Sequence, residues 1–410
     1  MIIKIIPHKL HGEVQAIPSK SYVHRVLIAQ KLAEIQSGTR LNMDVPIISE
    51  DLEATRNCLA QLDKDRPYLD CNESGSTLRF LMPVAAVLKD ESTFIGKGRL
   101  PERPISPLKE EMERHGCKIF RGKSTDTKYQ EICTITGRLE YGHYSLPGNL
   151  SSQFITGLLF ALPILNGNSS VRLTSTLESA AYVDMTIHVL TQFGIHIETT
   201  VNDYGFFEYF IPGNQTYVAP ETIEIEGDWS NAAFWLACKS LGSDVTISGL
   251  NPHSCQGDKA MLDKLVTMGC PPKGANISVA QTPDIVPPLA LVMSVTEGSS
   301  MITNAERLKY KESNRLISTF DTLHTLGADV SYGGAGLSFT GVPHLKGGTV
   351  DSYGDHRIAM MAAIASCVCE EPVIIHNAEA VKKSYPHFFD DFVSLGGEIY
   401  EVNPVRKADE

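Results

Sequence analysis

The sequence predicts an α/β (α+β) protein made of two similar domains, each containing three repeat units. One pattern occurs six times: an amphipathic helical stretch ends in a short break, and a β-like segment follows. One break, near Gln61-Leu62-Asp63, lacks glycine. The other five carry the residue that favours a left-handed helix end, at Gly116, Gly194, Gly269, Gly327 and Gly396. Their separations of 78, 75, 58 and 69 residues suit an α/β subdomain of two helices and several strands.

The length of 410 residues supports two or three domains, at roughly 100–200 residues each. We expect junctions near Gly12-Glu13 and near Glu226-Gly227-Asp228, where a polar region gives way to an apolar helix. One domain would then span residues 14–226, and the other residues 1–13 and 227–410. The N-terminal segment Met1–Pro7 is expected to be a strand. If it pairs with the C-terminal half, the two domains are joined by a two-strand hinge suited to closure on a ligand.

Helices are expected where an apolar-periodic run follows a polar or glycine-containing turn. The first follows Pro18-Ser19, with Val23, Val26, Leu27 and Leu32 on its apolar side. Further helices are expected, in chain order, after the loop 73–77, from Ser152, from Tyr182, from Trp229, from Asp284, after Asn314 and after His356.

Several of these predicted helices carry a cation near their first turn, where the helix dipole disfavours positive charge. Lys20 and Arg25 follow Pro18-Ser19. Arg79, Arg315 and Arg357 each follow a polar loop that contains serine or glycine. Because backbone N–H groups at such loops bind anions, several helix ends are expected to face one polyanionic ligand.

The overall charge restricts what this ligand is. The formal net charge is −12, so broad electrostatic binding to nucleic acid or to an anionic membrane is not expected. The longest apolar stretches, residues 154–165 and 358–369, are shorter than the ~20 residues of a membrane-spanning helix. Nine cysteines without paired spacing, and no secretory signal, predict reduced thiols and a cytoplasmic protein.

Standard cofactor motifs are missing from the sequence. The Gly116–Ser124 stretch has five residues between its glycines where a P-loop needs four. The sequence contains no G-x-G-x-x-G after a strand, no H-E-x-x-H, no zinc-type Cys/His quartet and no G-x-S-x-G. We therefore expect neither a metal ion nor an organic cofactor.

Each polar motif also has a purely structural reading. Ser19-Lys20-Ser21 is explained by a helix cap with a solvated lysine, and Asp284 by a cap at the start of an apolar helix. Glu312 is explained by ion pairing with its basic neighbours, and Lys383 by an ordinary loop. Tyr182 fits a core or cap role at least as well as ligand contact.

The motifs taken together, in their order, resemble one family. They are Ser-Lys-Ser-x-x-x-Arg, Gly-Ser-Thr-Leu-Arg, Glu-Arg-Pro-Ile, Ser-Ser-Gln-Phe, Lys-Glu-Ser-x-Arg, Gly-Asp-His-Arg-Ile-Ala-Met and Lys-Ser-Tyr-Pro. This set closely resembles the 5-enolpyruvylshikimate-3-phosphate synthase family of enolpyruvyl transferases, and it spans Lys20 to Pro386. The resemblance implies two domains, each of three βαβαββ units, that close around shikimate 3-phosphate and phosphoenolpyruvate.

The resemblance also implies the contacts of both substrates. Those of phosphoenolpyruvate are Lys20, Gly75, Arg103, Gln153, Arg315, Arg357 and Lys383. Those of shikimate 3-phosphate are Ser21, Arg25, Ser151, Ser152, Gln153, Ser179, Tyr182, Asp284, Arg307 and Lys311. Most of the second set lies in the 14–226 domain, whereas the other domain carries Asp284, Glu312, Arg315, Arg357 and Lys383. Many charged groups suit two substrates with phosphate and carboxylate groups, since arginine binds both oxyanions bidentately.

The implied reaction transfers the enolpyruvyl group to the 5-hydroxyl and releases phosphate, in chorismate and aromatic amino acid biosynthesis. Asp284 is the expected base for the hydroxyl, and either Glu312 or Lys20 is the expected acid for the methylene carbon. Two positions depart from the family pattern. Glu73 stands where many members have Asn, so it either points away from the phosphate site or pairs with a base. Arg307, where some members have Asn, is expected to contact the substrate phosphate.

Two other functions remain open. A UDP-N-acetylglucosamine enolpyruvyl transferase has the same fold and donor, but the serines at 151, 152 and 179, beside Arg25 and Lys311, favour a small phosphorylated acceptor. A non-catalytic anion-binding module is disfavoured by the presence of both Asp284 and Glu312. The expected protein is a cytoplasmic monomer that acts on small molecules and is the target of glyphosate.

Overall fold

The protein is described by a computed structural model over residues 1–122, 129–269 and 273–402. The chain forms two compact units. The first unit contains Pro18–Glu226 together with Cys255–Gly257. The second unit contains Met1–Ile17, Gly227–Ser254 and the chain from Asp258 onward.

In the first unit, the residues that the structure describes form two four-stranded sheets and six α-helices. The helices are α1 (Lys20–Gln36), α2 (Glu50–Gln61), α3 (Gly75–Leu88), α4 (Leu108–Arg114), α5 (Ser152–Ala161) and α6 (Ala180–Gln192). The strands are β3 (Tyr68–Asp70), β4 (Glu91–Gly96), β5 (Lys118–Arg121), β6 (Gln130–Thr136), β7 (His143–Leu146), β8 (Ser169–Leu173), β9 (Glu198–Val201) and β10 (Phe207–Ile211).

The second unit contains the remaining elements. Its helices are α7 (Trp229–Ser240), α8 (Met261–Met268), α9 (Val286–Ser294), α10 (Arg315–Thr325), α11 (His356–Ala365) and α12 (Phe388–Ser394). Its strands are β1 (Ile2–Ile6), β2 (His11–Gln15), β11 (Asp244–Ser248), β12 (Asn276–Ser278), β13 (Ser299–Thr303), β14 (Asp329–Gly333), β15 (Gly336–Thr340), β16 (Gly348–Asp351), β17 (Val373–His376) and β18 (Glu398–Glu401).

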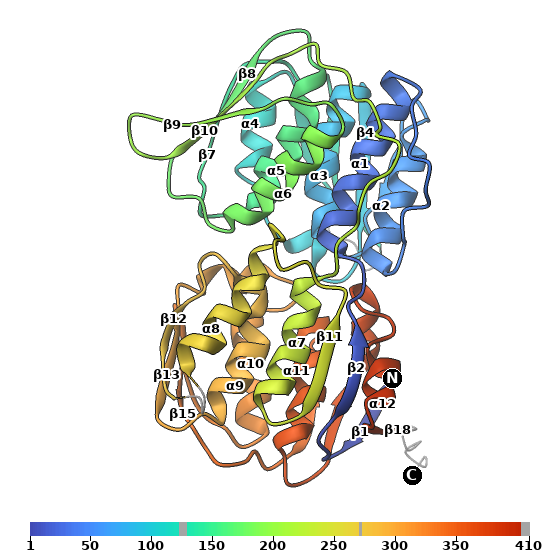
Figure 1. Ribbon diagram of the computed structural model, residues 1–410. Coiled ribbons are helices and arrows are strands. Elements are labelled where there is room, and N and C mark those ends of the chain that lie inside the picture. Colours follow the sequence, from blue (N-terminus) through green and yellow to red (C-terminus); the bar gives the residue numbers. More distant parts are fainter. Residues whose placement is uncertain (123–128, 270–272, 403–410) are drawn as a thin grey trace, which may run out of the picture. The chain divides into compact units, whose positions relative to one another are not determined.

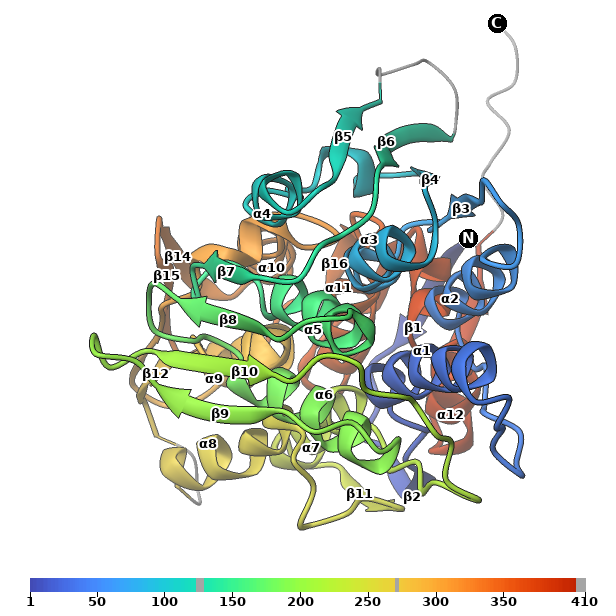
Figure 2. The same cartoon turned by 90° about the horizontal axis from the view of Figure 1, so that it is seen from above.

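Four sheets share one topology, in which a parallel pair is extended by two antiparallel strands. Their orders are β3-β4-β6-β5, β7-β8-β10-β9, β12-β13-β15-β14 and β16-β17-β1-β18. Figure 2 shows the second of these, with β7, β8, β10 and β9 side by side. With two helices each, three of these sheets form consecutive βαβαββ units.

The fourth sheet takes its third strand from the N-terminus of the chain. β1 pairs antiparallel with both β17 and β18, so it occupies the place that β6, β10 and β15 hold in the other sheets. This pairing confirms the expected N-terminal strand and explains why Met1–Ile17 belongs to the second unit.

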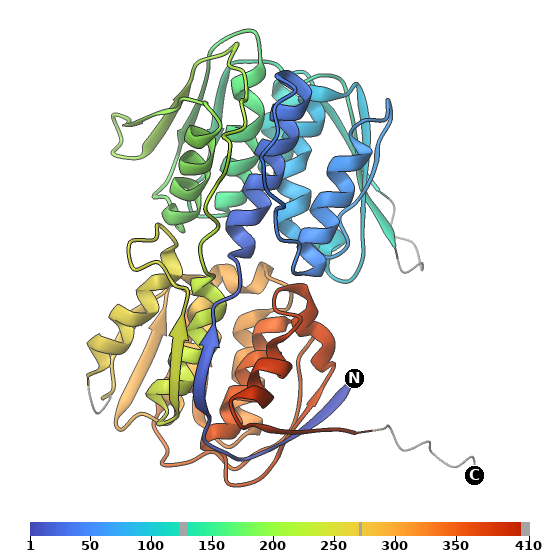
Figure 3. The same ribbon diagram turned by 45° about the vertical axis from the view of Figure 1, so that its right-hand side comes forward.

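The other two repeat units are shorter than the sequence pattern predicted. In the second unit, β11 lies between α7 and α8 along the chain. It pairs in parallel with β2, and the two strands form a separate sheet (Figure 3). In the first unit α1 leads to α2 and then directly to β3. The six predicted breaks nevertheless all lie between a helix and a strand: α2–β3, α4–β5, α6–β9, α8–β12, α10–β14 and α12–β18.

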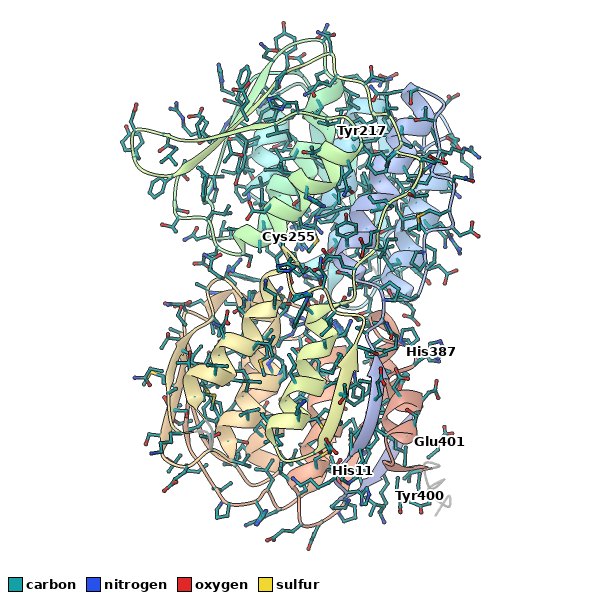
Figure 4. The ribbon with its side chains drawn as sticks, viewed as in Figure 1. His11, Tyr217, Cys255, His387, Tyr400 and Glu401 are labelled. Carbon is teal, nitrogen blue, oxygen red and sulfur yellow. The ribbon has the colours of Figure 1, made fainter. Side chains whose placement is uncertain are left out.

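One of the two passages between the units differs from its expected place. The first passage lies between Ile17 and Pro18, four residues later than predicted, because β2 extends to Gln15 in its pairing with β11. The second lies at Glu226–Gly227. A further excursion, Cys255–Gly257, belongs to the first unit; Figure 4 labels Cys255.

The helices at the centre of each unit are buried over most of their surface. All ten residues of α11 and all nine of α9 are buried, and α11 packs against α7, α9 and α10 (Figure 1). In the first unit α3 packs against α5, and α5 against α6. The expected site residues Lys20, Gln153, Arg315 and Arg357 lie in the first turns of α1, α5, α10 and α11. Within the described residues, no helix is long and apolar enough to cross a bilayer.

Candidate active site

The start of α1 places Lys20 in an ion pair that the sequence did not predict. Lys20 is the first residue of the helix, after the cap Ser19, and its Nζ lies 2.8 Å from Oδ2 of Asp51. Both side chains are largely buried. Asp51 lies in the first turn of α2, so the two helix starts meet through opposite charges. A carboxylate at that position offsets the unfavourable placement of Lys20 at a helix N-terminus.

One turn further along α1, the guanidinium of Arg25 is held by three acceptors. Its Nε donates to Thr186 Oγ1 at 2.8 Å, Nη1 to Ser21 O at 2.6 Å and Nη2 to Tyr182 O at 2.8 Å. The ring of Phe80 lies 5.2 Å from the guanidinium carbon. Burial lowers the pKa of Arg25 to about 10, so the group stays charged at neutral pH. The structure therefore brings Ser21, Arg25 and Tyr182 together.

The first turn of α3 meets that of α5 through a network of side chains. Arg79 Nη1 donates to Gln153 Oε1 at 2.7 Å, and Gln153 Nε2 donates to Ser76 Oγ at 2.9 Å. An added Cβ on Gly75 would lie 2.8 Å from Nη1 of both Arg79 and Arg103. Gly75, Arg103 and Gln153 thus lie close together, with Arg79 beside both Gly75 and Gln153.

Two further helix starts carry the expected serines. Ser151 is the cap of α5, and its Oγ accepts from Gln153 N at 3.3 Å; Ser152 is the first residue of that helix. Ser179 precedes α6 in a left-handed backbone conformation, with φ of 58°. A non-glycine residue at such a φ is uncommon and occurs often at functional sites.

Glu73, which stands where many family members have Asn, lies next to a glycine of a neighbouring loop. An added Cβ on Gly98 would lie 2.5 Å from Oε2 of Glu73, so the Glu73 carboxylate lies against the backbone at Gly98, just after β4. The acid at this position is therefore accommodated by a glycine on a neighbouring loop.

In the second unit, Asp284 is surrounded by cations. Its Oδ1 lies 3.1 Å from Lys311 Nζ, 2.7 Å from Arg315 Nη1 and 3.6 Å from Arg357 Nε. Arg357 Nη1 also donates to the backbone oxygen of Asp284 at 3.0 Å. Burial by itself raises the pKa of Asp284, but Lys311, Arg357 and Arg315 together lower it well below its usual value. Asp284 is therefore ionised at neutral pH.

Arg315 connects this group to two further carboxylates. Its Nη2 pairs with Glu312, and its Nε donates to Asp355 Oδ2 at 2.9 Å. Asp355 is fully buried and caps α11 by accepting from Arg357 N at 3.0 Å. Buried charges of this kind are stable only as a set, since removing one partner typically costs about 3–5 kcal/mol. Asp284, Lys311, Glu312, Arg315 and Arg357 thus form one charged cluster.

The two other basic residues that were expected in the site, Arg307 and Lys383, donate hydrogen bonds to backbone carbonyl oxygens. Arg307 Nη2 donates to Ala280 O at 2.6 Å, and Lys383 Nζ donates to Gly354 O at 2.6 Å. Gly354 is three residues before Arg357, so Lys383 lies at the loop that starts α11.

Sequence reasoning missed four residues that hold the predicted ones in place. They are Asp51, Asp258, Asp355 and Ser230; Ser230 Oγ donates to the buried Asp258, and its backbone oxygen accepts from Arg357 at 3.4 Å. Asp355 had a signal, because it directly precedes His356-Arg357 at a helix start. The others are distant in sequence from the residues that they contact. Within the described residues, no group of three or more His, Cys, Asp or Glu side chains forms a candidate metal site.

Comparison with solved structures defines the class of protein. The chain superimposes on EPSP synthase from Acinetobacter baumannii with a TM-score of 0.76 at 23% identity, covering 98% of this chain and 100% of the other. It also superimposes on the enolpyruvyl transferase NikO from Streptomyces tendae, with a TM-score of 0.75 at 16% identity and coverages of 97% and 98%. The fold is therefore that of the enolpyruvyl transferases.

Sequence comparison identifies the family within this class. The family model of EPSP synthase (3-phosphoshikimate 1-carboxyvinyltransferase) matches residues 63–392. The 3-phosphoshikimate 1-carboxyvinyltransferase of Clostridium kluyveri is 42% identical, over 97% of this chain and 98% of that protein. That of Clostridium novyi is 40% identical, over 97% and 98%. The chain belongs to the EPSP synthase family.

Proposed function

We propose that this protein transfers the enolpyruvyl group of phosphoenolpyruvate to the 5-hydroxyl of shikimate 3-phosphate and releases phosphate, in aromatic amino acid biosynthesis. Family membership supports this reaction, and relatives about 40% identical over nearly the whole chain carry the corresponding name. The observation that carries the proposal is Asp284, a buried carboxylate in contact with three cations. Besides an acid for C3, this reaction requires a group that accepts the hydroxyl proton and groups that bind anions, and Asp284 with its three cations supplies both.

We assign substrate contacts by motif. Phosphoenolpyruvate is held by Lys20, Gly75, Arg103, Gln153, Arg315, Arg357 and Lys383. Shikimate 3-phosphate is held by Ser21, Arg25, Ser151, Ser152, Gln153, Ser179, Tyr182, Asp284, Arg307 and Lys311. Contacts that some of these side chains make in the structure support the assignment. Arg25 and Arg307 of one set and Lys383 of the other donate to backbone carbonyls, and phosphate and carboxylate oxygens are stronger acceptors that would replace those partners.

Asp284 is the proposed general base. Its pKa is held low by Lys311, Arg315 and Arg357, which makes it a weak base without substrates. When phosphate and carboxylate groups bind these cations, their field at Asp284 is partly neutralised and its pKa rises toward the ordinary range. The substrates thereby increase the basicity of the group that must accept the hydroxyl proton.

The reaction proceeds in two steps. The 5-oxygen loses its proton to Asp284 and bonds to C2 of phosphoenolpyruvate, while a proton is added to C3. The C2–O bond to phosphate then breaks, and loss of a proton from the new methyl group restores the C2–C3 double bond. The cations stabilise negative charge on the phosphate that leaves.

The acid at C3 is either Glu312 or Lys20. Glu312 pairs with Arg315 in the second unit, whereas Lys20 pairs with Asp51 in the first. Incorporation of solvent deuterium into the methylene group of phosphoenolpyruvate distinguishes them: the variant lacking the acid, Glu312→Gln or Lys20→Met, should lose this exchange.

The deciding experiment measures phosphate release from phosphoenolpyruvate with and without shikimate 3-phosphate. Release that requires shikimate 3-phosphate supports the proposal. Release that requires a UDP-sugar instead would identify the related acceptor, and tight binding of both anions without turnover would identify a non-catalytic module. We further propose that the protein is a cytoplasmic monomer, binds neither nucleic acid nor membranes, needs no metal or organic cofactor and is inhibited by glyphosate.

A further inference from the structure

A buried chain of side-chain hydrogen bonds runs through the first unit, from α1 to the loop before α3. His24 Nδ1 lies 2.8 Å from Thr55 Oγ1, Thr55 Oγ1 lies 2.6 Å from Thr77 Oγ1, and Thr77 Oγ1 donates to Ser74 Oγ at 2.7 Å. All four side chains are at most 1% exposed. The chain therefore joins three helices that are distant in sequence through neutral polar groups only.

Ser74 and Thr77 of this chain adjoin residues assigned to phosphoenolpyruvate. Ser74 is the cap of α3: its Oγ accepts from Thr77 N at 3.2 Å, and Gly75 follows directly. Thr77 Oγ1 also lies 3.4 Å from the backbone oxygen of Asp51, whose carboxylate holds Lys20. The position of the Gly75 loop relative to Lys20 is thus fixed through the two threonine hydroxyls.

The tautomer of His24 determines which group donates in each hydrogen bond of the chain. Burial, followed by the charges of Lys20 and Arg25, lowers the pKa of His24 well below 6.5, so its ring is neutral. Within the described residues its Nε2 is buried without a hydrogen-bond partner. A buried unpaired N–H is rarer than a buried unpaired acceptor, which favours the tautomer with the proton on Nδ1. His24 then donates to Thr55, Thr55 to Thr77, and Thr77 to Ser74.

We propose that the chain His24–Thr55–Thr77–Ser74 is a positioning element that holds the Gly75 loop in place relative to the Lys20–Asp51 pair, and thereby sets the affinity for phosphoenolpyruvate. None of its four hydroxyl or imidazole groups needs to touch substrate. The inference rests on the proposed function, in which this loop binds phosphoenolpyruvate.

The test uses substitutions that keep shape and remove the hydroxyl. Thr77→Val and Thr55→Val should each raise KM for phosphoenolpyruvate from a few-fold to about tenfold, the range for one neutral hydrogen bond. KM for shikimate 3-phosphate should change by less than twofold. Thr77→Ser, which restores the hydroxyl but not the methyl group, should return KM for phosphoenolpyruvate to within twofold of wild type.

The matched control is Thr93→Val. Thr93 Oγ1 lies 3.0 Å from Thr134 Oγ1 across two strands of the same unit, so this variant also loses one hydroxyl pair. Both KM values should stay at the wild-type level. Urea unfolding of all four variants separates lost stability from lost affinity. If Thr77→Val does not fold, Thr55→Val, which keeps the Thr77–Ser74 bond, is the variant measured.

The outcomes separate the inference from the function. A wild-type protein that releases no phosphate in the presence of both substrates overturns the proposed function itself. An active wild type, with unchanged KM for phosphoenolpyruvate in the valine variants, overturns the positioning role alone. So does an equal rise of KM for both substrates, or a failure of Thr77→Ser to restore the value.

Discussion

Gly75→Ala is expected to weaken binding of phosphoenolpyruvate and glyphosate by displacing two arginines. The added Cβ would lie 2.8 Å from Nη1 of both Arg79 and Arg103, whereas favourable contacts between heavy atoms lie near 3.5–4.0 Å. Both guanidinium groups must therefore move by roughly 0.7 Å or more. Arg79 is fixed by Pro104 O and Gln153, so the movement also strains the contacts of Gln153.

The magnitude follows from the interaction that is disturbed. A hydrogen bond to a charged group contributes about 1.5–3 kcal/mol, and the loss of one such bond corresponds to roughly a 10- to 100-fold weaker interaction. We expect KM for phosphoenolpyruvate to rise about 10-fold or more and the inhibition constant of glyphosate to rise further, because an added methyl group also narrows the space for the ligand. KM for shikimate 3-phosphate should change much less, because only Gln153 among the named partners of this network is also assigned to that substrate, whereas Arg25 lies outside the network.

The assay is steady-state phosphate release, with glyphosate varied at fixed phosphoenolpyruvate. Gly334→Ala is the matched control, because nothing lies within 4 Å of the position of its added Cβ. A double-mutant cycle with Arg103→Lys tests whether the added methyl group acts by displacing Arg103. If it does, the effects of the two substitutions on KM for phosphoenolpyruvate should not be additive. Equal glyphosate inhibition constants for wild type and Gly75→Ala would refute the placement of Gly75 in this pocket.

Three further predictions concern the charged groups. Asp284→Asn should lower kcat by about 10²–10⁴-fold while substrate affinity changes little, since the amide cannot accept a proton; normal turnover with weakened binding would instead make Asp284 a binding residue. Substrates should compact the protein, because their charges relieve repulsion between the cations that each unit carries; an unchanged radius of gyration in small-angle scattering with both substrates would contradict this. Burial, with the Asp284 carboxylate, raises the pKa of Asp258 to about 6. Because the folded protein favours the neutral carboxyl, its contribution to stability is fully present below the unfolded pKa of 3.8 and is lost as pH rises through 6. Asp258→Asn should therefore raise Tm relative to wild type at pH 7.5 but not at pH 3.5. Equal Tm differences at both pH values would show that Asp258 is not the titrating group.

Local signals in the sequence were sufficient for elements whose stability is local. The N-terminal strand and the helix starts at Lys20, at Arg315 and next to Arg357 follow from capping residues and apolar periodicity, and the structure confirms them, with α11 beginning at His356. A cation in the first turn of a helix is unfavourable without a counter-charge, and the structure supplies a carboxylate to Lys20 and to Arg315. Binding of ligand anions at these helix starts stays a prediction.

The partners of these cations could not be predicted from the sequence, because they are distant from the cations along the chain. Asp51 is 31 residues from Lys20, and Asp258 pairs with Ser230 across 28 residues, so only tertiary packing brings them together. The shorter first repeat was missed for a similar reason: strand formation depends on pairing with distant strands, which a repeating helix signal does not reveal.

The proposed mechanism requires Asp284 to be stable while buried and basic when substrates bind, and the charged cluster around it meets both requirements. Without substrates, three cations keep it ionised and compensate its burial, so the empty site avoids an uncompensated buried charge. The same cations are the groups that phosphate and carboxylate oxygens would bind. In the proposed mechanism, substrate binding transfers their attraction from Asp284 to the ligand, and the carboxylate becomes a stronger base only when a hydroxyl is present to be deprotonated. Replacing Lys311 with Met should mimic part of this transfer, since loss of one cation raises the pKa of Asp284 even in the free protein. The acid limb of the pH profile of kcat/KM should then move to higher pH, and an unmoved limb would mean that Lys311 does not control the base.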